Sequence, residues 1–436
     1  MKKLYTLALS FITTIGILNA QTPCSSGRYA NDTFTAVTTS SVAYGANTSF
    51  SGSNTTLVMD IYQPDGDTET NRPLIIWAHG GSFIGGTRAD GDMVALSQAF
   101  AKKGFVCASI EYRLGFFPFD SANAIKAVLR AVQDMKASIR FFYKDKQTAN
   151  NYKIDTNNIF IGGSSAGAIT ALQTAYLDKS CEINYYVSPT TLSAMGGMDG
   201  YSGNQCYSSK VKGVINLCGA LGRYGWLEPG DIPFCSMHGT IDGTVKYNRG
   251  MVNPGTPLML LDGSRMLKEQ ANAIGVNNPF YTWYGQDHVP YASNSAYMDT
   301  TIKFIRDFLV STMGCTVTPL MPENTPAQTA TLYSYSTCTT NVTMPCAPVS
   351  VKELSMQNTI STVYPNPSSS DVTIEFANLS TTHFVELLDI TGKTIIKETT
   401  DEHTIKINRA EVADGMYILK VTDKSGETAT QKLIFQ

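Results

Sequence analysis

Residues 159–168 constrain the fold more than any other stretch of this 436-residue chain. The run Ile-Phe-Ile enters a Gly-Ser cluster, and small and apolar residues with helical character follow it. Ser165 stands at the centre of a G-x-S-x-G pattern between Gly163 and Gly167. A strand, a sharp turn and a helix in this order project the central hydroxyl to where a base can reach it. The sequence therefore predicts a nucleophilic serine on a strained turn.

A second motif follows the predicted buried strand Leu74–Ala78. It begins at His79 and carries paired glycines, Gly80 and Gly81. Glycines at the end of a strand let backbone N–H groups point into a cleft without a Cβ in the way. Together with the N–H of Ala166, they are expected to form an oxyanion hole, which holds the charged oxygen of a tetrahedral intermediate.

The general base is found by elimination among five histidines. Two of them, His383 and His403, lie in the C-terminal region, and His79 precedes the serine. The triad order serine, acid, histidine then leaves two candidates. We predict His288, on the loop before the closing helix, as the base, and His238 as a structural residue that supports the next loop.

The acidic partner is expected on that loop. Asp242 follows a strand end on a turn that contains glycines, so its carboxylate is predicted to face the imidazole. The alternatives are Glu228 and Asp231, on the loop after the predicted strand Val211–Leu217. Asp287 is expected to point elsewhere, since it is adjacent to the histidine in sequence.

The chain divides into four predicted parts. Residues 1–20 have a basic start, an apolar stretch and a small-residue cleavage site, which together indicate a signal peptide. Residues 21–315 alternate strand-like and helical segments, which predicts an α/β domain with a mostly parallel sheet covered on both faces. A Pro/Thr-rich linker is expected over 316–361 and a small β-sandwich over 362–436.

Composition excludes several classes of protein. The net charge of −3 and the pI near 6.0 give no electrostatic case for nucleic acid. No later segment is long and apolar enough to predict a membrane span. The cysteines show no C-x-x-C pair, so no metal site is expected.

Nine cysteines favour an oxidising destination. We predict that Cys24 pairs with Cys315, Cys181 with Cys206 and Cys338 with Cys346, although sequence alone does not fix connectivity. Three cysteines lie in predicted strands and are expected to be buried free thiols: Cys107, Cys218 and Cys235.

The segment between Cys181 and Cys206 is rich in Tyr, Ser and Gly, and loops at this point often cover the cleft. Several aromatic side chains are candidates to line an aromatic-acyl or polyester pocket. They are Phe83, Phe116, Phe117, Tyr224 and Trp226.

Residues 55–310 resemble the α/β-hydrolase carboxylesterases, close to the secreted feruloyl-esterase-like branch. The resemblance implies an α/β-hydrolase fold and ester hydrolysis through an acyl-enzyme without a cofactor. Ser82 departs from the pattern, because many relatives have a third glycine there. The matching motifs are His79–Phe83, Glu111–Leu114, Gly163–Gly167, His238–Asp242 and Asp287–His288.

Residues 362–436 resemble the sorting domain of the type IX secretion system of Bacteroidota. The resemblance implies an address read by that machinery and a secreted or outer-membrane-surface protein. The sequence thus favours a secreted serine esterase; a secreted peptidase on the same fold and a non-catalytic adhesion protein are the alternatives. The matching motifs are Tyr364–Pro367, Leu388–Lys393, Gly415–Val421 and Gln431–Gln436.

Overall fold

The computed structural model describes residues 24, 26–252, 255, 257–326, 330–332, 360–377, 382–389, 392–424 and 428–436. The predicted signal peptide and the predicted Cys338–Cys346 pair lie outside these residues. Two compact units make up the chain, Met1–Met344 and Pro345–Gln436.

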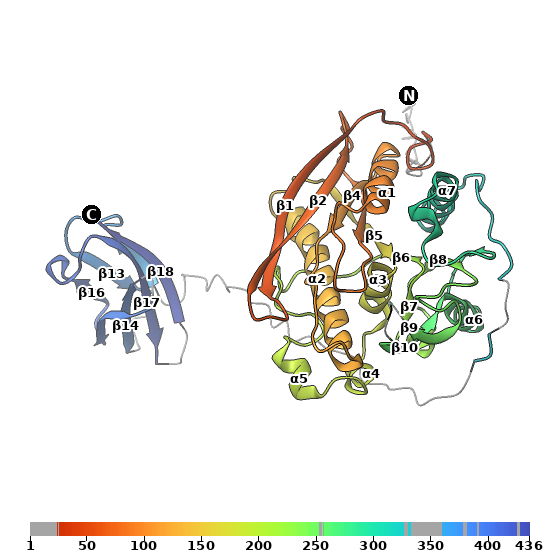
Figure 1. Ribbon diagram of the computed structural model, residues 1–436. Coiled ribbons are helices and arrows are strands. Elements are labelled where there is room, and N and C mark those ends of the chain that lie inside the picture. The colour runs from red at the N-terminus through yellow and green to blue at the C-terminus, as the bar shows by residue number, and fades with distance from the viewer. Residues whose placement is uncertain are drawn as a thin grey trace, which may run out of the picture. The chain divides into compact units, whose positions relative to one another are not determined.

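An eight-stranded sheet forms the centre of the first unit (Figure 1). Its first two strands are an antiparallel hairpin that joins β4 antiparallel, and the remaining neighbours are parallel. This mostly parallel arrangement confirms the predicted α/β-hydrolase fold. In sheet order the strands are β1 (Val37–Thr48), β2 (Asn54–Pro64), β4 (Val106–Ile110), β3 (Arg72–Ala78), β5 (Ile154–Ser164), β6 (Gly213–Leu217), β8 (Phe234–Gly239) and β11 (Phe280–Trp283).

Helices cover both faces of this sheet (Figure 1). On one face α1 (Gly91–Lys102) and α7 (Ser295–Thr312) share a buried apolar cluster with side chains of the sheet. A second cluster unites α2 (Ser121–Gln147), α3 (Ala166–Tyr176) and α6 (Ser264–Ile274) with the sheet. Because both faces are covered, the central strands β3 and β4 are buried along their whole length.

Two smaller segments complete this unit. An insertion after α3 carries two short helices, α4 (Ser180–Asn184) and α5 (Pro189–Ala194). A three-stranded sheet has the order β7 (Ala220–Leu221), β10 (Met259–Gly263) and β9 (Arg249–Val252). The short helix η1 (Tyr224–Trp226) follows β7 in the chain. A further short helix, η2 (Pro290–Ala292), lies between β11 and α7.

The first unit extends past the predicted domain end at residue 315. Asn324 pairs with both backbone groups of Thr282 in the edge strand β11, accepting from its N–H at 2.6 Å and donating to its carbonyl at 3.0 Å. Glu323 forms an ion pair with Lys268 at 2.5 Å. These residues therefore protect the open edge of the sheet.

The second unit is an all-β domain with its own core. Its strands form two antiparallel sheets, one of three and one of four strands, whose inward side chains form a separate apolar cluster. The first sheet holds β12 (Ile360–Tyr364), β13 (Val372–Phe376) and β16 (Thr404–Ile407); the second holds β15 (Thr394–Thr400), β14 (His383–Asp389), β17 (Gly415–Asp423) and β18 (Thr428–Phe435), and η4 (Arg409–Glu411) is a single turn.

One of the predicted disulfides is present, joining Cys24 to Cys315 across 291 residues of sequence. The predicted Cys181–Cys206 pair is wrong, because Cys181 is disulfide-bonded and Cys206 is not part of a disulfide. The two cysteines bracket the insertion in sequence, which does not by itself bring their Cα atoms to bridging distance. Cys107, Cys218 and Cys235 are buried free thiols, as predicted.

Candidate active site

Ser165 lies on a strained turn between β5 and α3, with φ 53° and ψ −115°. The flanking glycines are required there. A Cβ on Gly163 would lie 2.4 Å from the carbonyl oxygen of Ala78, and one on Gly167 would lie 1.9 Å from the same atom. The G-x-S-x-G pattern thus lets strand and helix approach β3 closely enough to form the turn.

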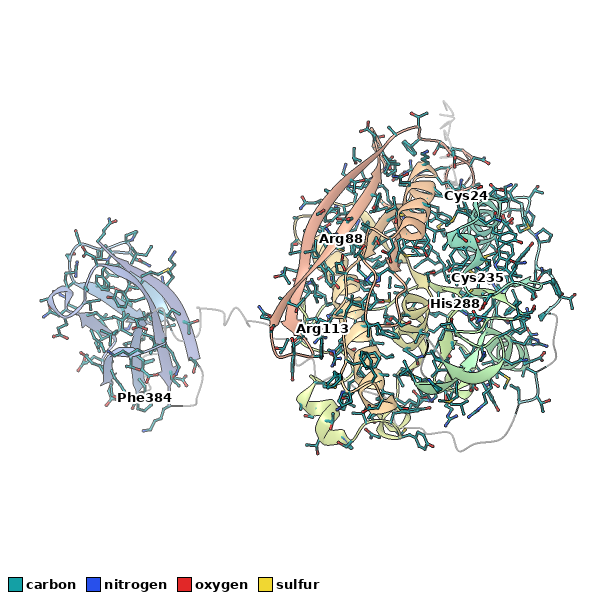
Figure 2. All side chains as sticks on the ribbon, viewed as in Figure 1. Cys24, Arg88, Arg113, Cys235, His288 and Phe384 are labelled. Atoms are coloured by element: carbon teal, nitrogen blue, oxygen red, sulfur yellow. A yellow bond between two sulfur atoms is a disulfide. The ribbon has the colours of Figure 1, made fainter. Side chains whose placement is uncertain are left out.

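The structure brings the three predicted triad residues together. His288 Nε2 lies 2.7 Å from Ser165 Oγ, and its Nδ1 lies 2.7 Å from Asp242 Oδ2. His288 follows β11 on the loop that leads to α7 (Figure 2), and Asp242 follows β8. Parallel neighbouring strands end at the same edge of the sheet, which is why these loops meet.

Asp242 is buried, and all of its acceptor positions are used. Its Oδ1 accepts from the backbone N–H groups of Thr244 at 2.9 Å and Val245 at 2.8 Å. Burial alone would raise the pKa of Asp242, but hydrogen bonds with His238 and His288 outweigh burial and hold the pKa well below its usual range. The carboxylate is therefore ionised at neutral pH.

The other acidic candidates lie elsewhere. Glu228 forms an ion pair with Lys179, and Asp231 accepts from the backbone N–H of Glu228 at 2.8 Å. Asp287 accepts from the N–H of Gly243 at 2.8 Å, so its carboxylate joins the two loops instead of facing the imidazole.

The loop after β3 packs closely against the turn that carries Ser165. A Cβ on Gly80 would lie 3.5 Å from Ser165 Cβ. Gly81 has φ 106°, and a Cβ there would lie 2.1 Å from the carbonyl oxygen of Gly85, so both its conformation and its surroundings require glycine. His79 is fully buried, stacks on Tyr112 with ring centroids 4.4 Å apart, and lies 3.7 Å from a Glu111 carboxylate oxygen. The predicted oxyanion residues Gly80, Gly81 and Ala166 thus lie next to Ser165 in the walls of the same pockets.

A polar pocket opens over the serine and includes His288 in its wall. Sequence reasoning missed two carboxylates here, Asp90 and Asp92 at the start of α1. Burial raises the pKa of Asp92, and a hydrogen bond with Ser164 partly offsets this effect. Ser164 Oγ in turn lies 2.5 Å from Tyr291 Oη, so a hydrogen-bonded chain joins α1 to the loop that carries His288. No local motif marks Asp92, because it comes close only through the packing of α1.

One group of side chains has the donor types of a metal site. Cys218, Asp242 and His288 offer one ligand atom each, and these atoms lie within 4.8 Å of one another. The same Asp242 and His288 atoms already share a 2.7 Å hydrogen bond. The arrangement therefore fits an imidazole–carboxylate pair with a thiol behind it.

The insertion after α3, which the sequence predicts to cover the cleft, does not line the pockets that include Ser165. The insertion after α3 packs on α2, where Gln133 donates to the carbonyls of Met195 at 3.0 Å and Gly197 at 2.7 Å. Tyr185 and Tyr201 are largely exposed, whereas Tyr186 lines an apolar pocket.

The chain is similar to known esterases over part of its length. Residues 59–222 match the family BD-FAE. A gut esterase 1 from Caenorhabditis briggsae is 29% identical over 126 residues, which is 29% of this chain and 22% of that protein. A carboxylesterase 3 from Pongo abelii is 30% identical over 128 residues, 29% of this chain and 21% of that protein. The chain thus spans about a fifth of the length of these curated relatives.

Among solved structures, esterase 2 of Thermogutta terrifontis phosphorylated by paraoxon is 20% identical with a TM-score of 0.47. The similarity covers 63% of this chain and 94% of that one.

Residues 362–436 match a secretion system C-terminal sorting domain. This match indicates type IX secretion and hence a secreted or cell-surface protein. None of the helices in the described ranges combines the length and the apolarity that crossing a membrane requires. The chain is therefore similar to α/β-hydrolase esterases in its first unit and carries a type IX sorting domain in its second.

Proposed function

We propose that this protein is a secreted serine esterase that hydrolyses carboxylic esters through an acyl-enzyme. The observation that carries the proposal is the hydrogen-bonded series Ser165–His288–Asp242, with 2.7 Å between each pair of polar atoms. The match to BD-FAE and the esterase relatives support the same reaction class.

In this mechanism His288 Nε2 takes the proton of Ser165 while Oγ attacks the ester carbonyl. Backbone N–H groups near Gly80, Gly81 and Ala166 stabilise the oxyanion. Collapse of the tetrahedral intermediate breaks the bond to the alcohol, whose oxygen receives the proton from His288. A water molecule then attacks the acyl-enzyme by the same route and releases the acid. Asp242 keeps the imidazole in the required tautomer and stabilises the imidazolium.

The test uses the full chain and p-nitrophenyl butyrate. Ser165→Ala is expected to reduce kcat by about 10⁴-fold or more, whereas Ser193→Ala, an exposed serine of α5, keeps the wild-type value. A fluorophosphonate probe should label the wild type at Ser165 and leave Ser165→Ala unlabelled. Near-full activity in Ser165→Ala would exclude the assignment.

The same assay separates the alternatives. A peptidase would also cleave a peptide anilide, which an esterase leaves intact, and an adhesion protein would neither turn over the ester nor react with the probe. For the alcohol and acyl groups, feruloyl esters of plant polysaccharides and polyesters are the classes proposed from the sequence. The second unit serves export, through recognition by the type IX machinery.

A further inference from the structure

A buried tyrosine links the loop that carries His288 to the turn that carries Ser165. Tyr291 lies on η2, three residues after His288, and is 1% exposed. Its Oη lies 2.5 Å from the Oγ of Ser164, the residue that precedes Ser165. Although 127 residues separate the two partners in sequence, this bond joins the loop of the proposed base directly to the turn of the proposed nucleophile.

Ser164 is held in turn by a carboxylate. Its side chain is buried, and its hydroxyl donates to Asp92 on the first turn of α1. A serine hydroxyl has one proton, so an oxygen that donates to Asp92 accepts from Tyr291. The Oδ1 of Asp92 also accepts from the backbone N–H of Met93 at 3.0 Å, which ties the carboxylate to the helix. The hydrogen bonds thus run from Tyr291 through Ser164 to Asp92.

The backbone between His288 and Tyr291 is strained. Val289 has φ 45° and ψ 55°, in the left-handed region that a β-branched residue rarely adopts. Such a conformation persists only where the surrounding structure holds it. Before His288 the loop is held by Asp287, which accepts from the N–H of Gly243 at 2.8 Å. After Val289 it is held by the bond from Tyr291 to the nucleophile turn, so the loop is anchored on both sides of the imidazole.

Resting on the proposed ester hydrolysis, we infer that Tyr291 is a positioning residue for His288. Its hydroxyl, bound to Ser164, keeps Val289 in the left-handed conformation and so holds the imidazole Nε2 at 2.7 Å from Ser165 Oγ. Without that bond Val289 relaxes toward the conformations that β-branched residues favour, and the imidazole moves away from the serine. Tyr291 is not among the described residues that line the polar pocket over Ser165. An ester therefore loses no contact with its hydroxyl, and the defect falls on kcat more than on KM.

The test compares two buried tyrosines in the full-length protein, with p-nitrophenyl butyrate as substrate. Tyr291→Phe keeps the ring and removes the bond to Ser164. We expect kcat to fall by about 10–100-fold, as for a small misplacement of a catalytic group, while KM changes by less than about twofold. Tyr176→Phe is the matched control, because Tyr176 is also 1% exposed and its hydroxyl donates to the carbonyl of Ile232 at 3.1 Å. The control should lose a similar amount of resistance to urea and keep the wild-type kcat.

A second variant tests the bond itself. Ser164→Ala removes the acceptor and should also lower kcat. In this background Tyr291→Phe should lower kcat no further, because the bond is already absent. A further loss of about tenfold would contradict the proposed role of the bond. If Tyr291→Phe does not fold, Ser164→Ala breaks the same bond from the other side, and an unchanged kcat in that variant would overturn the inference.

The outcomes separate this inference from the proposed function. An unchanged kcat in folded Tyr291→Phe, or an equal fall of kcat in Tyr176→Phe, would overturn the positioning role and leave ester hydrolysis in place. A wild type that hydrolyses no ester would instead remove the proposed function, and the positioning role with it.

Discussion

Asp242 Oδ2 is shared by two imidazoles: His288 Nδ1 lies at 2.7 Å and His238 Nε2 at 3.2 Å. His238 is fully buried and is held by Ser264 Oγ at 2.7 Å from its Nδ1 and by the carbonyl of Val245 at 2.9 Å from its Nε2. The histidine that the sequence predicts to support the acidic loop thus contacts the carboxylate itself. Its position fixes the carboxylate that is proposed to orient the general base.

His238→Phe should therefore impair both stability and turnover. The ring keeps the volume, but Ser264, Val245 and Asp242 lose a partner, which costs about 1–3 kcal/mol of unfolding free energy. A displaced Asp242 should lower kcat by about 10–100-fold with little change in KM. Urea unfolding and p-nitrophenyl ester kinetics measure the two effects.

The comparison variant is His238→Gln, whose amide N–H can still donate toward Val245 and Asp242. It should recover most of the lost kcat. Equal losses of kcat in the Gln and Phe variants would show that the hydrogen bond to Asp242 has no positioning role.

Glu182 should make the stability of the fold depend on pH with the opposite sign to Asp242. Burial raises the pKa of Glu182 to about 7, although the backbone N–H of Lys179 donates to its carboxylate at 3.1 Å. The folded-state pKa thus exceeds the unfolded value of about 4.3, so ionisation destabilises the fold above pH 7 and this penalty vanishes below pH 4.

Glu182→Gln is expected to stabilise the protein at pH 8 by about 1–2 kcal/mol, after allowance for solvent screening. The gain should disappear at pH 4. Thermal unfolding of both proteins at the two pH values measures it, and a gain that is the same at both would contradict the raised pKa.

The disulfide Cys24–Cys315 joins the start of the described chain to the end of α7 and closes a loop of 291 residues. Removal of a disulfide of this kind costs about 2–5 kcal/mol. Cys24→Ala, Cys315→Ala and the double variant should lose the same amount, because each change breaks the same bond. If the two single losses add up in the double variant, the bond does not form in the exported protein.

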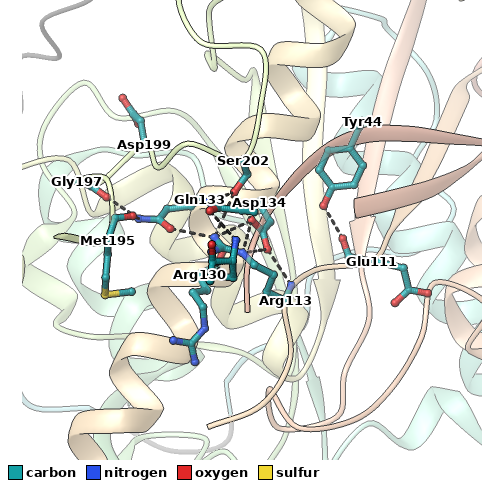
Figure 3. Close-up of polar contacts among 12 residues, drawn as sticks. Tyr44, Glu111, Arg113, Arg130, Gln133, Asp134, Met195, Gly197, Asp199 and Ser202 are labelled. Carbon is teal, nitrogen blue, oxygen red and sulfur yellow. Dashed lines mark hydrogen bonds and ion pairs between the residues drawn. The ribbon is translucent and has the colours of Figure 1, made fainter. Parts of the chain in front are cut away.

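The ion pair of Arg113 and Asp134 is buried, with side-chain atoms 2.9 Å apart, and Ser202 of the insertion lies 2.5 Å from Asp134 (Figure 3). Asp134→Ala should cost about 3–5 kcal/mol, because the guanidinium of Arg113 keeps its burial and loses its counter-charge. Ser202→Ala should cost only about 1 kcal/mol. Urea unfolding measures both, and similar small losses would show that water reaches Arg113.

Local signals made much of this molecule predictable. The turn at Ser165 and the loop at His79 carry glycines at positions that a sharp strand-to-helix turn and an exposed backbone N–H require, and the predicted strand Leu74–Ala78 lies within β3. The N-terminal hairpin was not predicted, since β1 is rich in Ser and Thr and mostly exposed, which weakens the apolar alternation. Contacts between distant segments, such as Asp92 with Ser164, have no local signal because tertiary packing creates them.

The second unit should be dispensable for ester hydrolysis. The second unit has its own apolar core, and Ser165, Asp242 and His288 all lie in the first unit. A chain of residues 21–344 should therefore keep the wild-type kcat/KM on a small ester, while the same truncation in the native host should prevent export.

A chain of residues 21–315 also lacks Asn324 and Glu323, which bond to β11 and Lys268. It should unfold at a lower temperature than the chain that ends at residue 344, because the edge of β11 loses its partners. Thermal unfolding and ester kinetics of both chains, with Asn324→Ala in the longer one as the matched variant, test this difference. Equal unfolding temperatures would place the end of the folded unit at residue 315, and a large loss of activity in the folded 21–344 chain would mean that the second unit contributes to the site.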